Sequence, residues 1–239
     1  MTDEMTRTRT VRARPHGRDR SRRWIRRVLI GLAALLVLVV LGAWALITFS
    51  SVPPPLALPA RVSAPAGPLD GSWHAAAGSV AGFRVPETAF GLSNDTVGRT
   101  SHVTGTVTVA GGQVTGASFR ILVASVLVNG KPQPQIAASL RTRRYPDATF
   151  SLAGPVTLGP AFAAGGTLHA AAAGRLVLNG LSRPVTVTVT ARRDGAAIEL
   201  AGTVPVSFAT WDITGPSGFG FVFSLAGHGE VEFLLALRQ

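Results

Sequence analysis

Few side chains in this sequence could bind a metal or act in catalysis, and their spacing fits neither kind of site. The five histidines show neither the i, i+4 nor the short-loop spacing of a zinc or iron site (His16, His74, His102, His169 and His228). Cysteine is absent, which excludes a thiolate nucleophile, a disulfide and a cysteine metal ligand. No Gly-x-Ser-x-Gly segment marks a nucleophilic serine. The sequence therefore predicts no enzyme, no metal site and no cofactor.

A pair of carboxylates near the C-terminus has the wrong geometry for acid–base catalysis. Glu230 and Glu232 lie two residues apart in a segment where apolar and polar residues alternate. On a strand, this spacing places both side chains on the same face, opposite the apolar ones. We interpret them as solvated charges that favour solubility.

The net charge of +11 is concentrated at one end of the chain. Residues 1–27 contain ten arginines against three acidic residues, which accounts for +7. The uncharged run that follows, residues 28–49, is long enough at ~1.5 Å per residue to cross the ~30 Å hydrocarbon core of a bilayer. Arginine excess beside such a run is typical of a cytoplasmic flank. A nucleic-acid-binding arm and a cleaved signal peptide are the alternatives, but this apolar run is longer than a signal peptide's.

We therefore predict a single-pass cell-membrane protein with a basic cytoplasmic segment, 1–27, and a transmembrane helix, 28–49. The rest of the chain is expected outside the cytoplasm, and no nucleic-acid partner is expected. Six prolines in residues 50–69 favour an extended polyproline linker. At ~3.1 Å per residue, this linker could hold the next domain up to about 60 Å from the bilayer. That domain is expected over residues 70–239.

From residue 70 onward the sequence alternates with a period of two, which is typical of half-buried strands. Strands are expected over 102–109, 118–127, 184–191 and 198–206, and in the C-terminal segment 219–237. Glycine-containing pairs that suit tight hairpins separate them. These pairs are Gly111-Gly112, Asn129-Gly130, Asn179-Gly180 and Asp194-Gly195. Since antiparallel sheets of eight to ten strands usually close on themselves, we predict an all-β fold with a barrel of about eight strands.

Five segments of this domain resemble, in order, those of the YceI-like family of polyisoprenoid-binding proteins. The most specific is GRLVLNGLSRPVTVTV at Gly174–Val189, and YPDATF at Tyr145–Phe150 is the next. The other three are Gly71–Val85, Val97–Gly105 and Ser207–Ile213. The resemblance covers residues 70–237. It implies a lipocalin-like antiparallel barrel whose apolar lumen takes up a polyisoprenoid tail.

The inward apolar residues of the expected strands are the candidate lumen. They could contact a ligand or simply fill a core, because a small barrel can be plugged by its own side chains. Runs of alanine and glycine supply little volume and favour an open lumen. The candidates are Phe119, Ile121, Val123, Val187, Val189, Leu200, Phe221, Phe223, Phe233 and Leu235.

A basic cluster stands where a loop meets the barrel. Arg141, Arg143 and Arg144 could bind the head group of a lipid whose tail enters the lumen, although exposed loop charges are the alternative. Two functions stay open from the sequence. One is a membrane-anchored carrier, store or sensor of an apolar lipid, and the other is a filled barrel that serves as a protein interaction module at the cell envelope. A homodimer is possible in either case.

Overall fold

The computed structural model describes residues 18–48, 52–89, 92–215 and 223–239. They belong to two units, residues 1–51 and 52–239. The first contains the helix α1 (Arg18–Thr48), whose side chains are described from residue 27 to residue 42. Among the described residues, no helix combines the length and apolarity that crossing a membrane requires. The membrane span over 28–49 thus stays a prediction, and its last residue, Phe49, lies outside the described residues.

The second unit is built almost entirely of strands, joined by short turns and three short helices. The strands are β1 (Gly71–Ala75), β2 (Val80–Ala89), β3 (Leu92–Thr100), β4 (Val103–Ala110), β5 (Gln113–Leu122), β6 (Leu127–Val128), β7 (Asp147–Leu152), β8 (Val156–Thr157), β9 (Leu168–Leu178), β10 (Leu181–Asp194), β11 (Ala197–Ser207), β12 (Phe223–Leu225) and β13 (His228–Arg238). The helices are the 3-10 turn η1 (Val123–Ser125), α2 (Pro134–Ser139) and α3 (Gly159–Ala163).

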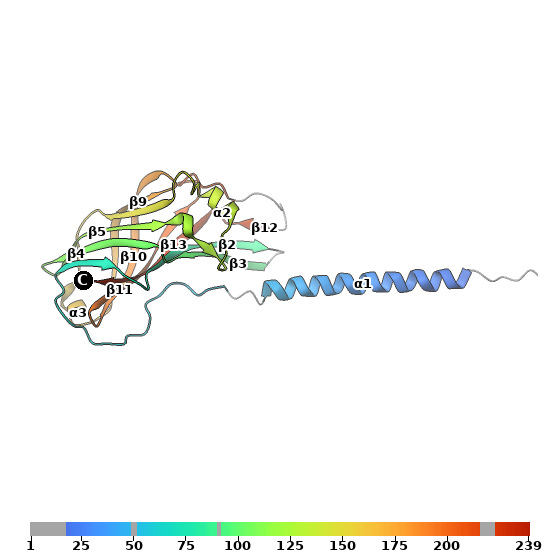
Figure 1. Ribbon diagram of the computed structural model, residues 1–239, viewed down its shortest axis with the longest axis horizontal. Coiled ribbons are helices and arrows are strands. Elements are labelled where there is room, and N and C mark those ends of the chain that lie inside the picture. The colour runs from blue at the N-terminus through green and yellow to red at the C-terminus, as the bar shows by residue number, and fades with distance from the viewer. Residues whose placement is uncertain (1–17, 49–51, 90–91, 216–222) are drawn as a thin grey trace, which may run out of the picture. The chain divides into compact units, whose positions relative to one another are not determined.

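Eight of these strands close into a ring. The order β1-β4-β5-β7-β9-β10-β11-β13 returns to β1 through a pairing of β13 with β1, and every pairing is antiparallel. The N-terminal half of the same edge of β13 pairs with β2, which is followed in the sheet by β3 and β6. Figure 1 shows α3 and the C-terminus at one end of the barrel, and α2 and β12 at the other. The predicted all-β class and the barrel of about eight strands are confirmed.

The strands form where the sequence alternates, because each buries one face and exposes the other. In β4, Val103, Val107 and Val109 are buried while Thr104 and Thr108 are exposed. Two-residue turns join consecutive strands where glycine can adopt positive φ. Such turns are Gly111-Gly112, with φ of 58° and 73°, and Asn179-Gly180, with φ of 53° and 79°.

Two expected strands differ from the structure. The strand expected over 118–127 ends at Leu122, because the chain then enters the η1 turn. The hydroxyl of Ser125 stabilises this turn by donating to the carbonyl of Leu122 at 2.7 Å. Of the strand expected within 219–225, only Phe223–Leu225 is described, as β12, and residues 216–222 lie outside the described residues.

The proline-rich segment does not project from the barrel as a free spacer but lies along its outer surface. We call residues 52–69 the strap. Near its start, the strap covers Glu232, which is 2% exposed. One carboxylate oxygen of Glu232 lies 2.9 Å from Arg99, and the other lies 3.5 Å from Arg84 and accepts the N–H of Leu56 at 3.3 Å. Arg84 also donates to the carbonyl of Pro53 at 2.8 Å.

This arrangement corrects the interpretation of Glu232 as a solvated charge. The side chain does point outward, as the alternation predicts, but two arginines and the strap enclose it. Its neighbour on the same face, Glu230, is exposed. Alternation in the sequence can show which face of a strand a side chain lies on. The burial of Glu232 on that face depends on the strap, whose Leu56 is 176 residues away in the chain.

A second anchor point fixes the other half of the strap. The two carboxylate oxygens of Asp194 accept the N–H groups of Val62 at 2.9 Å and Ser63 at 2.6 Å. The hydrogen bond from Val62 is the main reason that the pKa of Asp194 lies below its ordinary value. Because the pKa is lower in the folded than in the unfolded chain, this contact stabilises the strap at neutral pH and is lost as the pH falls through that lowered value. Further along, Arg193 donates to the carbonyl of Ala66 at 2.6 Å.

We expect Glu232→Gln to lower the free energy of unfolding by about 3 kcal/mol, since it removes a buried charge that compensates two arginines. The adjacent Glu230→Gln is the control and should change stability by less than about 0.5 kcal/mol, because its side chain is exposed. Urea denaturation of both variants measures the difference. If both substitutions changed the free energy of unfolding by less than about 0.5 kcal/mol, Glu232 would be solvated and the assignment would be wrong.

Candidate functional site

The barrel encloses two apolar cavities that adjoin each other. The inner chamber, of about 160 Å³, lies within the ring of strands, and the outer chamber, of about 130 Å³, lies at the end that carries α2. Four residues line both: Ala81, Ile121, Leu176 and Val231. These residues lie between the two chambers, because the same side chains border both spaces.

The inner chamber is closed at the α3 end. Phe162 from α3 and Leu237 from β13 both line it there and are 2% and 0% exposed. Trp73 packs in the same cluster, at 1% exposed, and its indole N–H donates to the carbonyl of Leu69 at 2.9 Å. The indole therefore has its polar partner without turning a polar atom toward the chamber.

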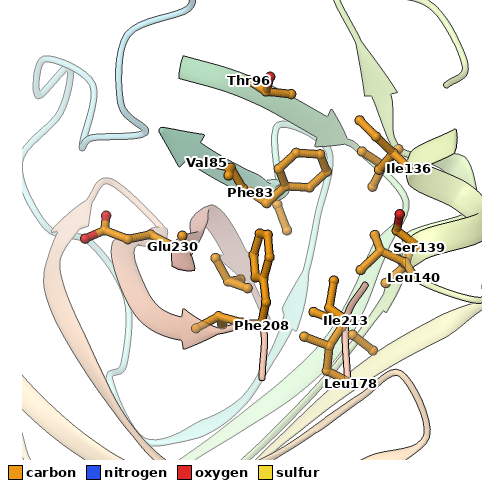
Figure 2. Close-up of a pocket in the computed structure, with 18 of the residues that line it drawn as sticks. Phe83, Val85, Thr96, Ile136, Ser139, Leu140, Leu178, Phe208, Ile213 and Glu230 are labelled. Carbon is orange, nitrogen blue, oxygen red and sulfur yellow. The ribbon is translucent and has the colours of Figure 1, made fainter. Parts of the chain in front are cut away.

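The outer chamber is bounded by several elements that are far apart in the sequence. Figure 2 shows Ile136 and Leu140, from α2 and the residue after it, on one side, with the rings of Phe83 and Phe208 near the centre of the view. Glu230 also borders this chamber, but its carboxylate points away from the aromatic rings (Figure 2). The outer chamber can therefore accept an apolar group without offering it a charged partner.

Glycines in the strands explain how four phenylalanines can line the lumen without filling it. Each ring lies against a glycine of the neighbouring strand, so closely that a Cβ there would approach a ring atom to 2.2–2.6 Å. A ring lying over a glycine stays near the wall, which leaves the centre of the barrel open. The pairs are Phe83 over Gly98, Phe119 over Gly105, Phe150 over Gly174 and Phe233 over Gly202.

The structure places eight of the ten predicted lumen residues in the walls of the two chambers. Seven line the inner chamber: Phe119, Ile121, Val187, Val189, Leu200, Phe233 and Leu235. Val123 lines the outer chamber. Phe221 lies outside the described residues, and for Phe223 the backbone is described but the side chain is not. Contact of these residues with a ligand stays a prediction.

The three arginines proposed for a head group have different surroundings. Arg141 lies 2.6 Å from a carboxylate oxygen of Asp212 and donates to the side-chain oxygen of Asn179 at 2.9 Å, so protein groups occupy its guanidinium. Arg143 and Arg144 are exposed. Within the described residues, none of the three lines either chamber. Arg141 joins the loop after α2 to the β9–β10 turn, while contact of Arg143 and Arg144 with a head group stays a prediction.

Sequence reasoning missed much of the outer chamber. Ile136 and Leu140 are spaced i, i+4 in a segment too short to show a helical period. Phe208 and Ile213 follow the end of β11, in a segment without regular alternation. Gly98 was the one residue in the sequence that could have indicated this chamber, since a glycine inside a strand often marks the close approach of another group.

The family comparison agrees with this architecture. Residues 73–235 match the model of the YceI-like domain. Because this match covers more than half of the chain, the protein belongs to the YceI-like family, and the resemblance noted in the sequence is confirmed.

The similar solved structures are distant in sequence. The polyisoprenoid binding domain from Saccharophagus degradans implicated in plant cell wall breakdown is 15% identical, with a TM-score of 0.55, over 70% of this chain and 97% of that chain. BcnA of Burkholderia cenocepacia is 22% identical, with a TM-score of 0.49, over 64% and 95% of the two chains. A YceI protein of Campylobacter jejuni is 13% identical, with a TM-score of 0.41, over 56% and 82%. The comparison with curated proteins gave no significant match.

The contact between Phe83 and Gly98 gives a direct test of the open outer chamber. In Gly98→Ala, the new methyl group would meet the ring of Phe83 and a methyl of Val126, both of them side chains, and should displace the ring toward the chamber. We expect about fivefold weaker binding of the neutral apolar dye N-phenyl-1-naphthylamine, equivalent to ~1 kcal/mol, measured by fluorescence titration. Gly116→Ala is the control, because nothing lies within 4 Å of its added methyl group. Unchanged binding in Gly98→Ala would contradict the assignment.

Proposed function

We propose that the barrel holds an apolar polyisoprenoid or a similar lipid in its lumen and acts as a carrier, store or sensor of that lipid. The observation that carries this proposal is the pair of adjoining apolar chambers inside a closed ring of strands. The polyisoprenoid binding domain of Saccharophagus degradans has the same fold, which supports this class of ligand.

Apolar burial alone could supply the affinity. Each Å² of lipid surface removed from water contributes about 25 cal/mol, so ~200 Å² would contribute ~5 kcal/mol before the cost of immobilising the lipid. No specific hydrogen bond is required. Ligands would then be selected by their shape and length, because the closed end at Phe162 and Leu237 limits how far a tail can enter.

Binding without catalysis fits the composition of the walls. Among the described lining residues, polar side chains appear only in the outer chamber, as Thr96, Ser139 and Glu230. A nucleophile needs a base within hydrogen-bonding reach. The described walls contain no histidine, lysine or arginine, and the carboxylate of Glu230 points away from the aromatic rings, on the side opposite Ser139 (Figure 2). We therefore propose a binding protein and not an enzyme.

We further propose that residues 28–49 anchor the protein in the cell membrane, with the N-terminus in the cytoplasm and the barrel outside it. The uncharged run and the ten arginines that precede it support this topology. An extracytoplasmic barrel beside the bilayer would have direct access to membrane lipids. The alternative, a filled barrel used as an interaction module, is disfavoured because its interior would have to be packed where the two chambers lie.

Neighbouring alanines on β9 provide a matched test of lipid binding. Ala172 lines the inner chamber, whereas Ala171 is exposed on the other face of the strand. Ala172→Phe should fill part of the inner chamber and weaken the binding of a polyprenyl alcohol at least about tenfold, or ~1.4 kcal/mol, in a calorimetric titration. Ala171→Phe should bind like the unchanged protein.

The titration is best made on residues 52–239, which include the strap and the hydrophobic cores of the barrel. A lipid should also be recovered from this fragment by organic extraction and detected by mass spectrometry. The proposal fails if the extracts are empty, polyprenyl alcohol does not bind, and the two alanine variants behave alike.

A further inference from the structure

The strap begins beside the outer chamber. Val52 borders a surface hollow together with Leu225 and Ala226, and Leu225 also lines the outer chamber. The strap then follows the barrel toward the α3 end (Figure 1), where Pro65 lies beside Gly165, just after α3. Val52 therefore lies next to the end of the outer chamber that is remote from α3, which we call the mouth.

This direction shortens the reach of the tether. A free proline-rich spacer of this length could have separated the barrel from the bilayer by about 60 Å. With residues 52–69 bound along the barrel, they are not available as a spacer. If residues 28–49 lie in the bilayer, the chain that comes from them reaches the barrel surface at Val52, beside the mouth.

The charge of the rim supports the same orientation. Residues 129–144 contain Lys131 and three arginines but no acidic residue, and α2 lies in the middle of this segment. Lys131, Arg143 and Arg144 are exposed. Cations at a membrane surface are attracted to anionic lipid head groups.

Acidic groups at this end of the barrel are mostly engaged within the protein. Asp212 pairs with Arg141, and Asp95 lies 3.0 Å from Arg84. Glu230 is exposed, on the side of the outer chamber opposite α2 in Figure 2. Glu87, which borders the same hollow as Val52, accepts a hydrogen bond from the hydroxyl of Thr96. Among the described residues, the exposed Lys131, Arg143 and Arg144 form no ion pair.

We propose that the strap and the basic rim hold the mouth of the lumen against an anionic bilayer surface, so that a lipid passes between bilayer and lumen without crossing water. This inference rests on the proposed anchoring and lipid binding. It adds the face of the barrel that meets the membrane and a role for the strap as an orienting tether.

Because the chain has no cysteine, single-cysteine probes can test the orientation in the full-length protein. Gln133→Cys places a fluorophore at the mouth, and Ala163→Cys places one at the closed end; both positions are exposed. The proteins are reconstituted in phosphatidylcholine vesicles with and without phosphatidylglycerol, and energy transfer to a labelled lipid is measured. We expect stronger transfer from Gln133→Cys. Equal transfer from both probes, or stronger transfer from Ala163→Cys, would overturn the proposal.

Exchange kinetics test the tether and the rim separately. A flexible Gly-Ser insertion between Ser51 and Val52 should slow the uptake of a fluorescent polyprenyl alcohol from vesicles several-fold, while the same insertion after Gly154, in an exposed turn, should not. The double substitution Arg143→Gln and Arg144→Gln should slow uptake only from vesicles that contain phosphatidylglycerol. If neither change slows uptake, the proposal is wrong.

Failure of the underlying function would look different. In that case the unchanged full-length chain would not stay with the vesicles, or would not take up the polyprenyl alcohol at all. If it does both and the mouth probe shows no bias toward the bilayer, the inferred orientation alone is overturned.

Discussion

Ring closure through β13 is the constraint on which the rest of the structure depends. One edge of β13 pairs with β11 along its full length, and the other edge is shared between β1 and β2. Closure satisfies the backbone groups that an open sheet would expose at its edges. It also turns one face of every strand toward a common interior, which is only wide enough for side chains or one slender ligand in a barrel of eight strands.

Whether that interior is filled depends on where the aromatic rings lie. The four glycines opposite Phe83, Phe119, Phe150 and Phe233 let the rings lie against the wall and leave space along the centre. The apo-barrel thereby loses contacts that a packed core would make, because side chains that border a void lack partner atoms on that side. A bound lipid would restore these contacts. Stability and ligand binding are coupled in this way, since anything that binds the folded state alone stabilises it.

The parts of the fold that follow from local pattern could be predicted, and the parts that depend on distant contacts could not. Alternation in segments such as 184–191 identified the barrel and the inward side of β10, because a strand's two faces are set by residue parity. Glu232 was misjudged because its burial depends on Leu56, Arg84 and Arg99, which belong to other segments. The proline content of the strap agrees with its lack of helix and strand, but composition cannot indicate that such a chain binds along a barrel.

An isotope-filtered nuclear Overhauser spectrum of residues 52–239 with a bound polyprenyl alcohol tests the central claim most directly, with the valine and leucine methyl groups labelled. The account predicts cross-peaks from the methyl groups of the lipid to Val187 and Leu235 of the inner chamber and to Leu140 of the outer chamber. Cross-peaks confined to exposed side chains such as Val62 and Leu127, with none to the chamber residues at saturating lipid, would contradict it.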